Sequence, residues 1–114
     1  MVVSLLPTEL DTVTVLRLSG DIDVQDMDEL LEAMTQLVLQ SQTRVVLNFR
    51  QVKHISLKAV SKLVQRNLRF RGLGADTKLV GLSPYVANLF KLVGAFSQFD
   101  VASDEEVAVA RFGS

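Results

Sequence analysis

The chain has 114 residues, the size of one domain, and 48% of them are hydrophobic while 22% are charged. It has no cysteine and one histidine, which excludes a disulfide framework, thiol chemistry and the usual zinc sites. The formal net charge of −1 argues against a dedicated nucleic-acid-binding protein. The apolar residues before Pro7 lack a basic flank, and no run approaches the roughly 18 apolar residues of a membrane span, so we expect a cytoplasmic protein.

The first part of the chain predicts two strands and a helix. Short runs rich in apolar and β-branched residues predict strands at residues 2–6 and 13–18. A helix follows, because apolar residues recur at helical spacing and acidic residues lie on the opposite face. The apolar residues of this helix are Met27, Leu30, Leu31, Met34, Leu37 and Val38. Either Asp23 or Asp26 is suited to cap its first turn.

The middle of the chain continues the alternation of strands and helices. Residues 45–47 predict a short buried strand, followed by a loop over residues 50–56. A second helix is expected from there to about Arg71, and residues 78–81 predict a further strand. The residues of the second helix expected to face the core are Val60, Leu63, Val64 and Leu68.

Two further helix starts appear in the last third of the chain. Ser83 and Pro84 are typical of the cap and first turn of a helix. Ser103 with Glu106 predicts a capping box at the start of a short C-terminal helix. Strands that alternate with helices indicate an α/β fold with a parallel or mixed sheet, and we expect one domain over residues 1–114.

Three segments, taken in order, resemble the STAS family, which comprises anti-sigma-factor antagonists and domains at the ends of sulfate transporters. They are residues 15–23 (VLRLSGDID), 45–49 (VVLNF) and 79–84 (LVGLSP), and residues 92–94 continue the match. The resemblance implies a four- to five-stranded mixed sheet with helices packed mainly on one face. It also implies a bacterial regulatory protein without a cofactor, whose partner is an anti-sigma factor with serine kinase activity or a signalling scaffold.

The position of the family's phosphorylation switch is altered in this chain. Antagonists of the family carry a Ser or Thr at the start of the second helix, and its phosphorylation releases the partner through charge repulsion and desolvation. Here Leu57 stands at that position, Ser56 replaces the aspartate before it, and Ala59 replaces a glycine. Asn48 stands where the family frequently has an aspartate. The ordinary switch is therefore expected to be absent; Ser56 is a candidate phosphosite, although a helix N-cap is its favoured role.

Charge is segregated along the chain. Residues 50–75 hold seven basic side chains and no acidic one, whereas residues 21–32 hold six acidic side chains and no basic one. On the second helix Lys58, Lys62, Arg66 and Arg69 share an arc of about 80°. Two interpretations stay open: a solvated face paired with the acidic helix, or a docking stripe for an acidic partner surface. The predicted partner-binding residues are Lys53, His54, Ser56, Leu57, Lys58, Lys62 and Arg66.

Two other classes of function stand beside a regulatory antagonist. The alternative is a cytoplasmic STAS accessory subunit of a membrane lipid ABC transporter, whose partner is the ATP-binding cassette protein. The third class is an enzyme or a nucleotide-binding protein. His54 has no nucleophile or carboxylate pair near it in sequence, so no catalytic residue is assigned and no enzymatic activity is expected. Asp21, Asp23 and Asp26 lack the calcium-loop pattern, so no metal site is predicted, and the oligomeric state stays open.

Overall fold

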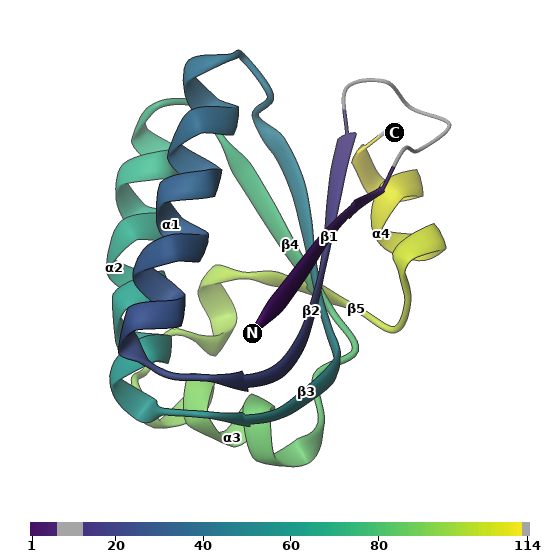
Figure 1. Cartoon of the computed structure of the whole chain (residues 1–114). Helices are drawn as coiled ribbons and strands as arrows, with labels where there is room; N and C mark the ends of the chain where they lie inside the picture. Colours follow the sequence, from purple (N-terminus) through teal and green to yellow (C-terminus); the bar gives the residue numbers. More distant parts are fainter. Residues whose placement is uncertain (7–12, 113–114) are drawn as a thin grey trace.

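The computed structural model describes residues 1–6 and 13–112, which form a five-stranded mixed sheet and four α-helices (Figure 1). The strands are β1 (Val2–Leu6), β2 (Val13–Ile22), β3 (Arg44–Ile55), β4 (Asp76–Val80) and β5 (Asp100–Ala102). The helices are α1 (Val24–Leu39), α2 (Leu57–Gly72), α3 (Pro84–Leu92) and α4 (Glu105–Phe112), with a 3-10 turn at Phe96–Gln98. None of the helices within the described residues is long and apolar enough to cross a bilayer.

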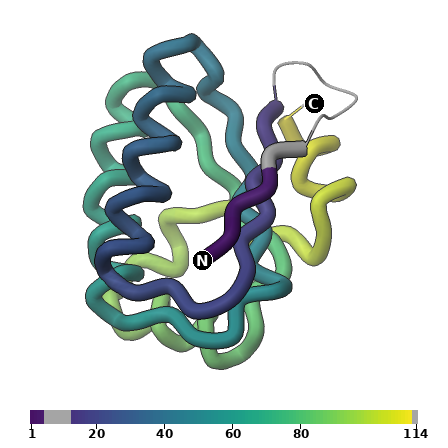
Figure 2. The backbone as a smooth tube through the Cα atoms, viewed as in Figure 1, coloured from purple at the N-terminus to yellow at the C-terminus, as the bar shows by residue number. Residues whose placement is uncertain are grey.

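The order of the strands across the sheet is β1-β2-β3-β4-β5. β1 runs antiparallel to β2, and all the other neighbouring strands are parallel. Helices α1, α2 and α3 cover one face of the sheet and α4 lies against the other (Figures 1 and 2). The predicted mixed sheet with helices mainly on one face is therefore confirmed, and α4 is the helix that departs from that face.

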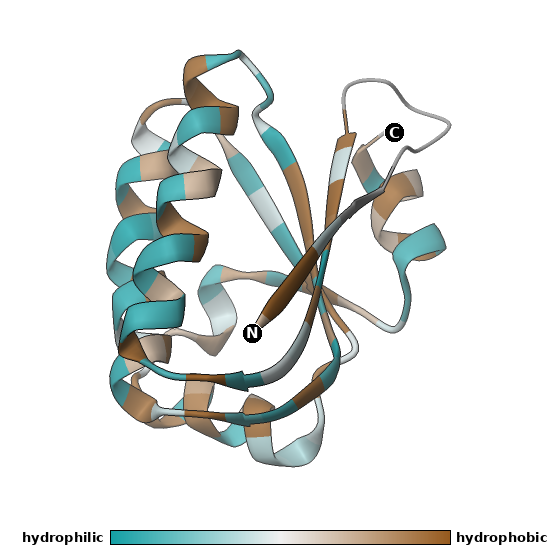
Figure 3. Cartoon of the chain, in the orientation of Figure 1, coloured by the Kyte–Doolittle hydropathy of each residue, from teal (hydrophilic) through white to brown (hydrophobic). Residues whose placement is uncertain are grey.

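The larger core lies between the sheet and helices α1 to α3. Three phenylalanine rings mark its centre: Phe90 of α3 meets Phe49 edge to face at 6.1 Å and Phe99 at 5.5 Å between ring centroids. Along α1 and α2 hydrophilic and hydrophobic segments alternate, as expected for helices that bury one side (Figure 3). On α2 the prediction that Leu68 faces the core is wrong, because this side chain is 53% exposed.

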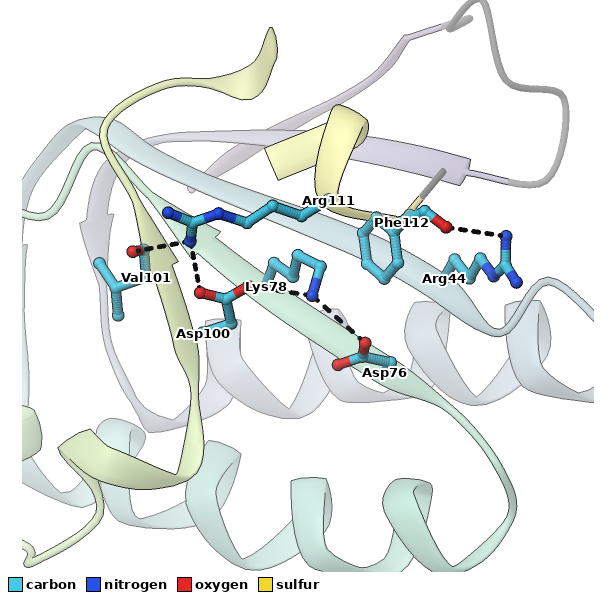
Figure 4. Close-up of polar contacts among 7 residues, drawn as sticks. All are labelled: Arg44, Asp76, Lys78, Asp100, Val101, Arg111 and Phe112. Carbon is cyan, nitrogen blue, oxygen red and sulfur yellow. Dashed lines mark hydrogen bonds and ion pairs between the residues drawn. The ribbon is translucent and has the colours of Figure 1, made fainter. Parts of the chain in front are cut away.

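A smaller apolar cluster lies on the opposite face of the sheet, beneath α4. Its buried members are Val13, Val15, Val46, Val80, Ala102, Ala108 and Phe112. Polar contacts hold the last turn of α4 in place (Figure 4). Lys78 lies 4.4 Å above the Phe112 ring, with its Nζ 3.0 Å from Asp100 Oδ2 and 3.4 Å from Asp76 Oδ2. Arg111 pairs with the same Asp100, so one aspartate of β5 links the helix to the sheet.

The expected loop over residues 50–56 is wrong, because β3 continues to Ile55. Its last residues pair with the end of β2, for example Gln51 with Ser19 and Ile55 with Ile22. This part of β3 buries Val52 and Ile55 but exposes the two polar side chains between them, which hides the strand pattern in the sequence.

Three of the four helix N-caps are the residues that the sequence predicts. Asp23 caps α1, accepting from the Asp26 backbone N–H at 2.7 Å while the Asp26 carboxylate accepts from the Asp23 N–H at 3.1 Å. Ser83 caps α3 through the Val86 N–H at 3.2 Å, as predicted. The capping box predicted from Ser103 and Glu106 is wrong: Asp104 caps α4 through the Val107 N–H at 2.9 Å. The fourth cap, Ser56, belongs to the candidate site.

Candidate functional site

The junction of β3 and α2 places the predicted site at one edge of the sheet. Ser56 is the N-cap of α2, and its hydroxyl oxygen accepts a hydrogen bond from the Ala59 N–H at 3.1 Å. The Ser56 N–H donates to the Ile22 carbonyl at the end of β2 at 3.1 Å, which ties the junction to the neighbouring strand. Leu57, the first residue of α2, is fixed by this cap yet remains 46% exposed.

Tyr85, which sequence reasoning did not assign to the site, belongs to the same edge. Its hydroxyl donates to the Ile55 carbonyl at 3.0 Å, two residues before Leu57, and the side chain is 47% exposed. The His54 ring meets the Tyr85 ring edge to face with 6.2 Å between centroids. The sequence offers one indication that Tyr85 belongs to the site. Tyr85 directly follows the Ser83-Pro84 helix start, and the start of a helix that follows a parallel strand lies close to the sheet edge.

The predicted basic residues divide into two groups. Lys53 and Lys58 are exposed and make no ion pair within residues 1–6 and 13–112. Lys62 instead pairs with Asp28 of α1, with Nζ 2.7 Å from Oδ1, and Arg66 Nη1 lies 3.5 Å from the Thr35 hydroxyl oxygen. Part of the basic stripe is therefore matched by the acidic helix beside it, and the part nearest the sheet edge is directed to solvent.

The first turns of α2 and α3 present positive charge at this edge, beside the exposed Asp21 and Asp23 of the neighbouring chain segment. Helix N-termini carry partial positive charge, and neither α2 nor α3 has an acidic residue in its first turn to offset it. The Tyr85–Ile55 hydrogen bond holds the start of α3 close to the start of α2. Lys53 of β3 and Lys58, which follows Leu57 in α2, are both exposed, so the edge suits a partner surface that combines acidic and apolar groups.

A second polar cluster, missed from the sequence, lies on the α4 side of the sheet. The Arg17 guanidinium donates two hydrogen bonds to the Glu105 carboxylate at 2.7 and 2.8 Å, and Asn48 Nδ2 donates to it at 2.6 Å. The Arg17 hydrogen bond is the main cause that lowers the pKa of Glu105, with Asn48 and the positive charges of Arg17 and Arg50 adding to it. No sequence signal joins Arg17 and Glu105, which lie 88 residues apart.

This cluster borders a hollow of about 440 Å³. Its lining residues are Arg17, Leu18, Asn48, Arg50, Gln51, Asp104, Glu105 and Glu106. The Glu105 carboxylate is already satisfied by Arg17 and Asn48, so these contacts fix α4 on the sheet. In the described part of the chain, no group of three or more His, Cys, Asp or Glu side chains is placed to hold a metal ion.

Comparison with known protein families identifies the family of this chain. The STAS domain family model matches residues 5–108. The chain belongs to the STAS family. Its sheet order, its α/β alternation and the helix that begins at the end of β3 are thus those of a STAS domain.

Solved structures share this STAS fold at low sequence identity. The phosphorylated form of the Bacillus cell fate determinant SpoIIAA is 20% identical with a TM-score of 0.74, over 97% of this chain and 99% of that one. An anti-sigma factor antagonist from Mycobacterium paratuberculosis is 18% identical with a TM-score of 0.79, over 99% and 96%. The murine anion transporter Slc26a9 is 15% identical with a TM-score of 0.75, over 90% of this chain but 18% of the transporter.

Proposed function

We propose that this chain, as one STAS domain over residues 1–114, is a non-enzymatic regulatory protein of the bacterial cytoplasm that acts by binding another protein. One of the similar structures is an anti-sigma factor antagonist from Mycobacterium paratuberculosis, which supports the antagonist role. The partner is then an anti-sigma factor with serine kinase activity or a signalling scaffold. The proposed binding residues are Lys53, His54, Ser56, Leu57, Lys58, Lys62 and Arg66, to which we add Tyr85.

The observation that carries this proposal is the exposure of Leu57 and Tyr85 at the edge where Lys53 and Lys58 make no ion pair with the described residues. Each of these two side chains is about half exposed; Leu57 follows the capped Ser56 in the first turn of α2, and the Tyr85 hydroxyl is fixed by its hydrogen bond to the Ile55 carbonyl. Side chains held in place lose little entropy on binding, and aromatic side chains are frequent anchors of protein interfaces. Lys53 and Lys58 are exposed on β3 and in the first turn of α2, and they favour an acidic partner.

We further propose that binding does not depend on the ordinary phosphorylation switch. Leu57 has no hydroxyl at the position where antagonists are phosphorylated, and the Ser56 hydroxyl oxygen is engaged as the cap of α2. A phosphate on Ser56 would lie at a helix N-terminus, which favours negative charge, so it would not disrupt the helix itself. Binding is then constitutive or controlled from the partner.

Affinity capture from the native cells tests the proposal. The tagged chain is compared with a Lys53→Glu/Lys58→Glu variant and with Arg71→Glu, a charge reversal at the far end of the same helix. We expect a kinase-like anti-sigma factor or a scaffold to be recovered with the wild type and Arg71→Glu and lost with the double variant. A partner retained by the double variant would contradict the proposed edge. Recovery of a transporter ATPase would replace the regulatory role with that of a transporter accessory subunit.

A further inference from the structure

The outward sides of α1 and α2 carry opposite charge: the acidic residues of α1 lie between Asp26 and Glu32, and the basic residues of α2 run from Lys58 to Arg71. The 16 residues of α1 include four acidic residues and no basic one, whereas the 16 residues of α2 include five basic residues and no acidic one. The two helices lie side by side on the sheet and run in the same direction (Figures 1 and 2). Together they form a surface with one negative and one positive half.

This opposite charge is only partly neutralised within the chain. Lys62 pairs with Asp28 at 2.7 Å, while Arg66 contacts the neutral Thr35 hydroxyl. Glu29, Glu32 and Arg69 are not buried and make no ion pair within residues 1–6 and 13–112. Two grooves, of about 190 and 330 Å³, lie between the helices. Glu32 and Arg66 both border the groove of about 330 Å³. Like charges along each helix repel one another unless a surface of opposite charge covers them.

Acidic residues of α1 and basic residues of α2 lie at the same height along the two parallel helices, and this limits how two copies can dock symmetrically. The Lys62–Asp28 pair shows that the first turns of α1 lie level with the first turns of α2. Face to face with a second copy, a twofold axis parallel to the helices sets α1 against the partner's α2 in both halves of the contact. A twofold axis across the helices would instead set α1 against α1 and α2 against α2, which like charges oppose.

Exposed leucines at the C-terminal ends of these helices fit the same arrangement. Leu39, the last residue of α1, is 73% exposed, and Leu73, directly after α2, is 67% exposed. With the axis parallel to the helices, the C-terminal ends of both copies meet at one end of the contact, which sets Leu39 near the partner's Leu73. Apolar contact there adds to the charge complementarity.

From this matched surface we propose that the outer faces of α1 and α2 are a self-association surface, on which a second copy of the chain docks about a twofold axis parallel to the two helices. A helix of this length is about 24 Å long, and two helices about 10 Å apart cover roughly 500 Å² per copy. The total of about 1,000 Å² is at the lower end for specific interfaces. The dimer is therefore weak, concentration-dependent and sensitive to salt.

This inference does not rest on the proposed function. Over the length of α2 the contact would cover the basic stripe of Lys58, Lys62, Arg66 and Arg69, so in a cell the dimer and the proposed acidic partner compete for it. Self-association would then set how much of the chain is free to bind, whatever the identity of the partner.

Sedimentation velocity of the purified chain over a concentration series tests the proposal. At low salt we expect the weight-average sedimentation coefficient to rise from monomer toward dimer, and we expect high salt to return the chain to monomer. Two charge-reversal variants sharpen the test: Glu29→Lys/Glu32→Lys on α1 and Arg66→Glu/Arg69→Glu on α2. Each alone places like charges against each other in both halves, so its association is expected to weaken at least tenfold. Lys91→Glu on α3 is the matched control and keeps the wild-type behaviour.

Sedimentation of an equimolar mixture of the two variants tests whether opposite charge on facing helices drives the association. Each variant reverses two charges on one helix, so in the mixed pair the lysines introduced on α1 of one chain face the glutamates introduced on α2 of the other, which restores opposite charge at the exchanged positions, and a heterodimer is expected to form. A wild-type chain that stays monomeric at every concentration would overturn the proposal, as would a dimer that persists in either variant or at high salt. Folded variants whose mixture stays monomeric would also overturn it. If a variant does not fold by circular dichroism, the salt series of the wild type decides between the same two outcomes.

Discussion

Replacing Leu57 by aspartate separates what this side chain contributes to the fold from what it contributes to partner binding. Leu57 is 46% exposed, so about half of the roughly 2 kcal/mol that a fully buried leucine contributes is at stake. The new carboxylate lies in the first turn of α2, which has no acidic residue, and gains about 0.5 kcal/mol from the helix dipole. The net loss of about 0.5 kcal/mol lowers Tm by roughly 2–4 °C.

Leu68→Asp is the matched control on the same helix. Leu68 is 53% exposed and lies 11 residues further along, which is about 16 Å on a helix, away from the β3–α2 junction. We expect Leu57→Asp to weaken partner capture at least tenfold with a small change in Tm, and Leu68→Asp to leave capture unchanged. Thermal unfolding by circular dichroism and quantitative capture measure the two effects. Undiminished capture by Leu57→Asp would refute the binding edge, and a loss of more than about 10 °C in Tm would refute the burial estimate.

Four further outcomes follow from the contacts within the fold. The lowered pKa of Glu105 stabilises the folded state above its ordinary value near 4.5 and ceases to do so as the pH falls through the lowered pKa. The difference in free energy of unfolding between wild type and Glu105→Gln should therefore shrink in acid, and urea titrations showing a constant difference would contradict it. Gly81→Ala should destabilise more than Gly74→Ala in thermal melts, since both have positive φ but only at Gly81 would a Cβ lie 2.9 Å from a backbone nitrogen. Asp23→Ala should cost about 1 kcal/mol in chemical denaturation by removing the N-cap of α1, and no loss would argue against that cap. Phe90→Ala should cost about 3–5 kcal/mol in the same assay, because the ring is fully buried between two others.

Local patterns in the sequence predicted most of the secondary structure. The caps at Asp23 and Ser83 were readable because a cap is set by a few neighbouring residues. β5 was not readable, since three residues that include a charged aspartate show no period. The place of α4 on the far face was not readable either, because it depends on contacts such as Arg17–Glu105 between distant parts of the chain.

The candidate site was predictable only in part. The cap role of Ser56 followed from its position before a helix, and the altered switch at Leu57 followed from the resemblance to the family. The sequence does not decide whether the basic stripe of α2 pairs with acidic residues of α1, because it does not say which side of α2 meets α1. The structure divides the stripe, with Lys62 paired to Asp28 and Lys58 exposed. Tyr85 joins the site through a contact 30 residues away in sequence, which no local pattern encodes.

The strands take the same order in the sheet as in the chain, and this bears on how the protein is made. Each strand pairs with the one synthesised just before it, so the sheet can grow at a single side while the chain leaves the ribosome. The larger core is completed only near the end of synthesis, because the Phe90 ring packs against both Phe49 and Phe99. A nascent chain that ends before Phe99 therefore leaves one side of the Phe90 ring without its packing partner and exposed to solvent or to a chaperone.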